Sequence, residues 1–139
     1  MVDLLVKMVL LLFVVPYNIE GCKEQVHVHN NLPPNSPQLQ LHCASGDDDL
    51  GHNFPKVGAD FHWSFCYTPR TLFFCHFWWN GKDLAFDVYN NGDHCVDGGT
   101  GFVPSFTSQC HWQVQSDGFY LGYYDQDSRQ LVFKKFHNW

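Results

Sequence analysis

This sequence lacks most of the patterns that mark enzymes, membrane-spanning proteins and zinc domains. Its longest uninterrupted apolar run, Met8–Val15, is far shorter than the roughly 20 residues that cross a bilayer as a helix. It has no G-x-S-x-G motif for a nucleophilic serine and no C-x-x-C pair for a structural zinc ion. It also has no N-x-S/T sequon, so N-glycosylation is not expected. We therefore expect no membrane insertion, no catalytic activity and no cofactor.

Basic residues are also scarce. The chain has 8 Lys and Arg against 14 Asp and Glu, which gives a net charge of −6. Nucleic-acid binding needs a basic face that neutralises phosphates, and anionic membrane surfaces attract clusters of Lys and Arg. The charge balance therefore argues against both kinds of partner.

The N-terminal residues have the pattern of a secretory leader. Lys7 precedes the apolar run Met8–Val15, Pro16 closes it, and Gly21 is a small residue suited to the cleavage point. We therefore predict a signal peptide over residues 1–21 and a secreted, extracellular domain over 22–139. That length suits one domain with one core.

All six cysteines lie in the predicted mature chain, at positions Cys22, Cys43, Cys66, Cys75, Cys95 and Cys110. An even number of cysteines in an exported domain indicates disulfides, which persist in an oxidising compartment. Six cysteines allow fifteen pairings, so their number alone does not select one.

The body of the chain alternates apolar and polar residues with the period of β-strands. Strands are expected around 26–29, 39–43, 61–66, 71–79, 84–89, 110–115, 119–124 and 130–136. Asn80-Gly81 predicts a hairpin, because both residues tolerate positive φ. About eight short strands separated by turns predict an all-β sandwich or barrel. Two long connections, Ala44–Gly58 and Val96–Gln109, are the expected recognition loops.

Several side chains are candidates for a binding site, each with a structural alternative. The run Asp47–Asp49 has the chemistry of a Ca²⁺ ligand, but it lacks the spaced oxygen set of an EF-hand. We favour a turn in which one Asp accepts backbone N–H groups while the others face water. Trp78 and Trp79 point to opposite faces of their strand, where either could anchor a partner or a sugar. We favour both being covered.

Histidines form a second set of candidates. His27 and His29 share one face of a strand and could chelate a metal ion. His42, His62, His76 and His111 would form a cluster if the strands brought them together. For His27 and His29 we favour a solvated pair on an edge strand, and for the other four we expect chance proximity only, so we predict no metal site.

At this point specific residues resemble a known family, the plant self-incompatibility S1 family or S-protein homologues. The matching motifs are His42-Cys43-x-Ser45-x-Asp47-Asp48-Asp49-Leu50-Gly51, Phe61-x-Trp63-x-Phe65, Thr71-Leu72-Phe73-Phe74-Cys75, Phe86-Asp87-Val88-Tyr89 and Cys110-x-Trp112-x-Val114. They occur in the family's order and extend over the whole mature chain.

The resemblance implies a small, antiparallel, disulfide-linked β-sandwich without catalytic activity or cofactor. It also implies a secreted plant protein recognised by a cell-surface receptor in reproduction, development or defence. The alternative is an extracellular module that binds a cell-wall glycan or a foreign protein directly. Both functions would use the two long loops.

The family resemblance also supports a disulfide pattern, because four of the cysteines resemble the family's core set. Cys43 and Cys110 share faces with inward-pointing residues, so we expect them to join the two sheets, and we pair Cys75 with Cys95. Cys66 points to the other face of its strand, where Cys22 can reach it.

Overall fold

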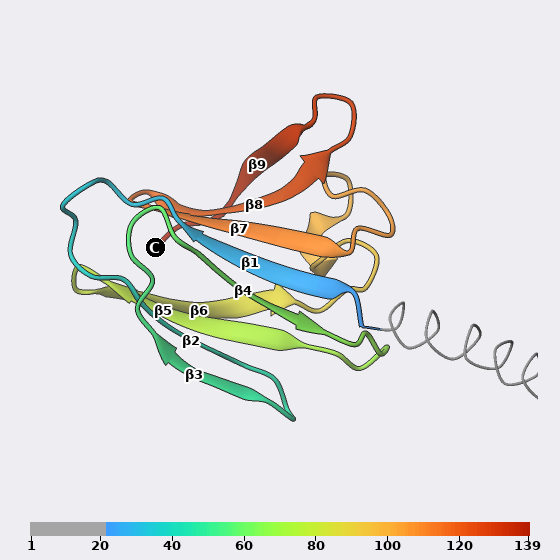
Figure 1. Cartoon of the computed structure of the whole chain (residues 1–139), viewed down its shortest axis with the longest axis horizontal. Helices are drawn as coiled ribbons and strands as arrows, with labels where there is room; N and C mark the ends of the chain where they lie inside the picture. The colour runs from blue at the N-terminus through green and yellow to red at the C-terminus, as the bar shows by residue number, and fades with distance from the viewer. Residues whose placement is uncertain (1–21) are drawn as a thin grey trace, which may run out of the picture.

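The computed structural model describes residues 22–139, so the predicted signal peptide lies outside the described residues (Figure 1). Nine strands and one short 3-10 turn make up this part of the chain. They are β1 (Glu24–Asn30), β2 (Gln40–Ala44), β3 (Asp49–Asn53), β4 (Asp60–Phe65), β5 (Phe73–Trp79), β6 (Lys82–Tyr89), η1 (Asp97–Gly99), β7 (Gln109–Gln115), β8 (Gly118–Asp125) and β9 (Gln130–His137). Within residues 22–139, no helix has the length and hydrophobicity needed to cross a bilayer.

The strands form a β-sandwich of two sheets (Figure 1). The five-stranded sheet has the order β4-β1-β7-β8-β9, and the four-stranded sheet has the order β3-β2-β5-β6. Neighbouring strands are antiparallel except β1 and β7, which run parallel. The prediction of an all-β sandwich is therefore confirmed, with one parallel pair inside an otherwise antiparallel fold.

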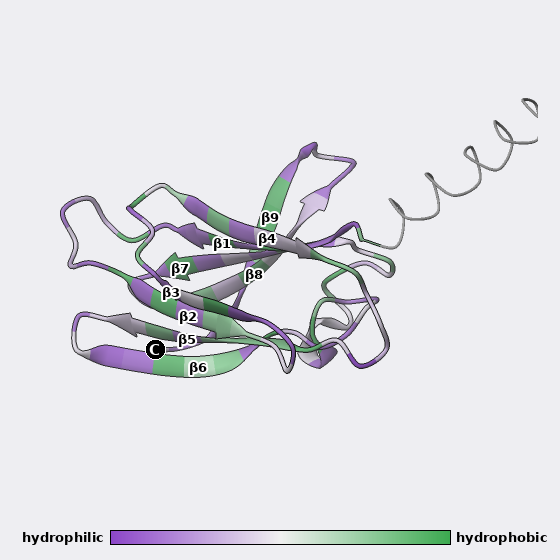
Figure 2. Ribbon diagram, turned by 60° about the horizontal axis from the view of Figure 1, so that its bottom comes forward, coloured by the Kyte–Doolittle hydropathy of each residue, from purple (hydrophilic) through white to green (hydrophobic). Residues whose placement is uncertain are grey.

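Alternating side chains of both sheets fill the core between them, and Figure 2 shows the bands of polar and apolar residues along β4. Trp112 of β7 is the largest fully buried side chain. Its indole N–H donates to the carbonyl oxygen of Val88 in β6, at 3.0 Å. Because β7 and β6 belong to different sheets, this hydrogen bond joins the two layers.

The eight predicted strands are present, but the prediction that Ala44–Gly58 forms one long loop is wrong. The structure has one strand more than predicted, β3, and this strand lies inside that stretch. Its sequence, DLGHN, is short and poor in the residues that favour strands, so alternation gave no signal for it. The Asn80-Gly81 hairpin is confirmed, with φ of 51° and 75° at the two residues.

The structure also corrects two of the three disulfide pairings. Cys22 pairs with Cys66 as expected, but Cys43 pairs with Cys75, and Cys95 pairs with Cys110. Cys43 and Cys110 do point inward and are buried. However, the sheet register puts Cys75 directly opposite Cys43 on the neighbouring strand, so the nearest inward sulfur lies in the same sheet.

The strand directions sort the connections into two groups at opposite ends of the sandwich (Figure 1). Residues 45–48, 66–72, 90–108 and 126–129 form what we call the loop end, on the right in Figure 1. Residues 31–39, 54–59, 80–81 and 116–117 lie at the other end, which we call the hairpin end. The stretch Ala44–Gly58 therefore contributes to both ends and not to a single surface.

Candidate functional site

The motif residues that follow β2 build a tight turn at the loop end. The Ser45 hydroxyl oxygen accepts hydrogen bonds from the backbone N–H of Asp48, at 3.0 Å, and of Asp47, at 3.3 Å. The Ser45 N–H in turn donates to the carbonyl oxygen of Asp48, at 2.7 Å. These three bonds satisfy backbone groups that no strand pairing serves, so Ser45 fixes the shape of the turn.

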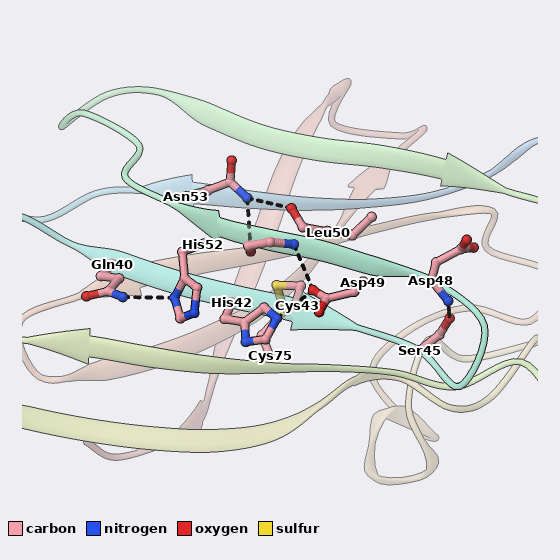
Figure 3. Close-up of polar contacts among 11 residues, drawn as sticks. Gln40, His42, Cys43, Ser45, Asp48, Asp49, Leu50, His52, Asn53 and Cys75 are labelled. Atoms are coloured by element: carbon pink, nitrogen blue, oxygen red, sulfur yellow. Dashed lines mark hydrogen bonds and ion pairs between the residues drawn. A yellow bond between two sulfur atoms is a disulfide. The ribbon is translucent and has the colours of Figure 1, made fainter.

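Asp49 then holds the turn against β2 (Figure 3). One of its carboxylate oxygens accepts the backbone N–H of Gly51 at 2.9 Å and the Nε2–H of His42 at 2.6 Å. The Gly51 N–H, followed by the His42 hydrogen bond, lowers the pKa of Asp49 below its usual value. Asp47 and Asp48 are exposed to solvent. As predicted, one carboxylate of the acidic run accepts a backbone N–H while the other two face water, but Ser45, and not that carboxylate, shapes the turn itself.

A groove lies between this turn and the loop that joins β4 to β5. Its lining includes Ser45, Asp47, Asp48, Arg70, Thr71 and Leu72. The Cys22–Cys66 disulfide ties one wall of the groove to the start of β1. Motif residues and exposed loop residues thus meet at one surface.

The predicted loop Val96–Gln109 forms a second part of the loop end. The Cys95–Cys110 disulfide closes its base, and His94 Nδ1–H donates to the carbonyl oxygen of Val103 at 2.7 Å. At its tip, the Phe106 side chain is 86% exposed. Phe106 lines a groove of about 500 Å³ together with Tyr123 and Tyr124 of β8.

Large exposed apolar side chains are distributed unevenly over the described residues. Seven occur. Three lie in the loop end, namely Tyr67, Leu72 and Phe106, and two lie on strands, each two residues from a loop of that end, namely Phe74 of β5 and Tyr124 of β8. The other two, Phe54 and Val57, lie at the hairpin end. Exposed aromatic and apolar side chains concentrated at one end of a domain are typical of binding sites.

The two tryptophans singled out from the sequence, Trp78 and Trp79, differ in how deeply they are buried. Trp79 is buried, and its indole N–H donates to the carbonyl oxygen of Pro37 at 3.1 Å. Trp78 is half-buried on the outer face of the four-stranded sheet, with its ring stacked 3.8 Å from that of His76. Neither side chain reaches the loop end.

The six histidines singled out from the sequence divide between the outer faces of the two sheets. His42 and His76 lie opposite each other on β2 and β5. His27, His62 and His111 lie opposite one another on β1, β4 and β7, with His29 two residues further along β1. The strands therefore do not bring His42, His62, His76 and His111 into one cluster. The expectation that His27 and His29 lie on an edge strand is wrong, because β1 lies between β4 and β7.

Sequence reasoning did not identify the exposed apolar residues of the loop end. Alternation marks the two faces of a strand but not the position of a loop residue such as Phe106. A signal was present, because Phe106 is a large aromatic residue flanked by Pro104, Ser105 and Thr107 in a loop rich in Gly, Ser and Thr. Such a residue has no strand neighbour to cover it.

These features define a class of protein, a disulfide-linked β-sandwich that presents fixed loops and exposed apolar side chains at one end. Comparison with known families narrows this class to one family. The chain belongs to the family described as plant self-incompatibility protein S1, whose sequence model matches residues 25–139.

Relatives from Arabidopsis thaliana support this assignment. S-protein homolog 2 is 36% identical over 98 residues, which cover 69% of this chain and 58% of the relative. S-protein homolog 4 is 36% identical over 101 residues, covering 69% and 61%. S-protein homolog 29 is 31% identical over 121 residues, covering 78% and 80%. The chain thus spans about three fifths of the length of the first two. No solved structure gives a significant match.

Proposed function

We propose that this protein is a secreted, non-catalytic ligand that a receptor at the plant cell surface recognises through the loop end. The observation that carries this proposal is the concentration of exposed apolar side chains at and beside this end: of the seven on the described residues, three lie in its loops and two more on the adjoining strand ends. Membership of the self-incompatibility S1 family supports it.

The loop end has the physical properties of a protein-recognition surface. Binding energy at interfaces comes mainly from a few aromatic and apolar anchors that become fully desolvated. Disulfides Cys22–Cys66 and Cys95–Cys110 hold two of the loops that carry these anchors, so less conformational entropy is lost on binding. The exposed carboxylates of Asp47 and Asp48 favour a partner with a basic rim.

Secretion is supported by two independent features. The three disulfides leave no free cysteine among residues 22–139, and disulfides persist in oxidising compartments. The apolar run Met8–Val15 has the pattern of a signal peptide core. We propose that the leader is removed and that the domain acts outside the cell.

The test is binding of the protein, expressed as the full chain in plant cells and purified from the medium, to a panel of plant plasma-membrane ectodomains. We expect one ectodomain to bind, and expect Phe106→Ser and Leu72→Ser each to weaken that binding at least tenfold. The matched control is Phe54→Ser, because Phe54 is also an exposed apolar residue, 56% accessible, but lies at the hairpin end. Equal losses in all three variants would contradict the assignment of the loop end.

A second candidate function is direct binding of a cell-wall glycan. The groove between Phe106, Tyr123 and Tyr124 favours it, because sugar rings stack on exposed aromatic side chains. A glycan array probed with the same protein separates the two proposals. A glycan hit that is lost in Phe106→Ser, without any ectodomain hit, would replace the receptor proposal.

A further inference from the structure

Three histidines form a straight row across the outer face of the five-stranded sheet. In the strand register, His27 of β1 lies directly opposite His62 of β4 on one side and His111 of β7 on the other. The imidazole rings of His27 and His111 stack with their centroids 4.5 Å apart. His29, the next residue on this face of β1, stacks on His111 at 5.2 Å.

At one end of the row, an aromatic side chain from β9 covers the histidines. Continuing across the sheet, His111 lies opposite Gly122 of β8, and Gly122 lies opposite Phe133 of β9. A side chain at position 122 would collide with the Phe133 ring, so glycine lets that ring lie over the sheet beside the histidines. Phe133 meets His29 edge-on, at 6.2 Å between ring centroids. His111 is consequently only 6% exposed, although it lies on the outer face.

The hydrogen bonds within the cluster leave imidazole nitrogens directed at one another. His29 Nε2 and His111 Nδ1 are 2.9 Å apart, so one ring donates its N–H to the lone pair of the other. An ion bound by this pair would replace this hydrogen bond, because each nitrogen would then offer its lone pair to the ion.

His27 has the arrangement of a supported metal ligand. Its Nδ1 lies 2.8 Å from a carboxylate oxygen of Asp60, to which it donates its N–H. A carboxylate in this position fixes the orientation of an imidazole. The other nitrogen, Nε2, lies 2.8 Å from the side-chain amide oxygen of Gln25, which has to move aside for Nε2 to bind an ion. In histidine metal sites, such outer carboxylates commonly support the ligating ring.

We propose that His27, His29 and His111 together bind one divalent transition-metal ion, with Asp60 as the positioning residue for His27. One ligand nitrogen from each of the three lies within 4.8 Å of the others. In a tetrahedral site with bonds of about 2.1 Å, ligand atoms lie about 3.4 Å apart, so small ring rotations close the cluster on an ion. This proposal is independent of the receptor proposal, because the site lies on a sheet face and not at the loop end.

The ligand set favours Zn²⁺, Cu²⁺ or Ni²⁺ over Ca²⁺ or Mg²⁺. Imidazole nitrogen suits the first group, whereas the second prefers oxygen ligands. No thiolate competes among residues 22–139, because every cysteine there is in a disulfide. Three protein ligands leave a fourth position for water or for a group from a partner molecule.

The opposite face of the sandwich supplies a natural control. His42, His52 and His76 also lie on neighbouring strands, and the His42 and His52 rings stack at 4.5 Å. However, among the described residues the ligand atoms of His42, His52 and His76 do not converge as those of the first set do. The structure therefore assigns metal binding to one of two otherwise similar histidine faces.

The experiment is calorimetric titration of the secreted protein with Zn²⁺ after chelator treatment, with Co²⁺ absorption as a readout of coordination. We expect one ion per chain and a visible d–d band in the Co²⁺ form. Asp60→Asn should weaken Zn²⁺ binding about 10- to 100-fold, as supporting residues do. His29→Gln should weaken it more than Asp60→Asn does, while the control His52→Gln should leave it unchanged.

Thermal unfolding separates loss of binding from loss of the fold. His29 is half-buried, so His29→Gln should keep a metal-free melting temperature near that of the wild type. Zn²⁺ should raise the melting temperature of the wild type and of His52→Gln but not that of His29→Gln, because a ligand stabilises only a fold that binds it. Absence of saturable binding, or equal weakening by His52→Gln and His29→Gln, would overturn the proposal.

Discussion

Cys43 and Cys75 lie directly opposite each other on the adjacent strands β2 and β5, and they form a disulfide inside the four-stranded sheet. This pairing closes a separation of 32 residues, for which chain entropy predicts about 4 kcal/mol of stabilisation. We expect the double variant Cys43→Ala/Cys75→Val to lose stability of that order in denaturant titrations.

Non-reducing tryptic mapping tests all three pairings at once, because cleavage sites at Lys23, Lys56, Arg70, Lys82 and Arg129 separate the cysteines. The peptide 24–56 should be linked to 71–82, and 57–70 should be linked to the peptide that ends at Lys23. The peptide 83–129 contains both Cys95 and Cys110, so it should be released without a partner. Its linkage to 24–56 or 71–82 would contradict the structure.

The disulfides also show how far the sequence could predict this fold. Alternation placed Cys43 and Cys110 on inward faces, which is correct, because the side-chain period of a strand is fixed by local geometry. The order of strands within each sheet depends on long-range packing that no local pattern records. Without knowing that β2 neighbours β5, the opposition of Cys43 and Cys75 was not predictable.

The recognition surface was predictable only in part, for a similar reason. The loop Val96–Gln109 was identified from its composition, and the structure places it at the loop end. The short strand β3 divides the other predicted loop. This strand was not predicted, because Asp49, Gly51 and Asn53 are residue types that seldom occur in strands. The histidine cluster required the register of β1 against β7, which was also unknown from the sequence.

Trp112 provides a test of how the two sheets are joined. Replacement by Phe removes the indole N–H and leaves the fully buried carbonyl group of Val88 without its partner. An unsatisfied buried polar group costs about 1–3 kcal/mol, to which the lost ring volume adds. We expect Trp112→Phe to lower the free energy of unfolding by at least that amount. The matched control, Trp78→Phe, changes a half-buried outer ring and should cost clearly less.

The motif turn should respond to loss of Ser45 more than to loss of its acidic neighbours. Ser45→Ala removes an acceptor for two backbone N–H groups and should cost roughly 1 kcal/mol of stability. Asp47→Ala removes an exposed carboxylate and should change the free energy of unfolding by about 0.5 kcal/mol or less. Urea titrations of both variants measure the difference. A larger loss for Asp47→Ala would show that the acidic run has a structural role beyond the turn.

His137, near the end of β9, should make the stability of the fold depend on pH. Burial lowers its pKa, since its ring packs against the aromatic rings of Phe86 and Trp112. The unfolded chain therefore binds a proton more readily, so the contribution to stability is present above a pH of about 6.5 and is lost as the pH falls through the lower, folded-state pKa. We expect unfolding free energies, measured in chelator between about pH 7 and about pH 4, to fall less steeply in His137→Gln than in the wild type. His62→Gln controls for removal of a histidine as such, and an unchanged slope in His137→Gln would contradict the assignment.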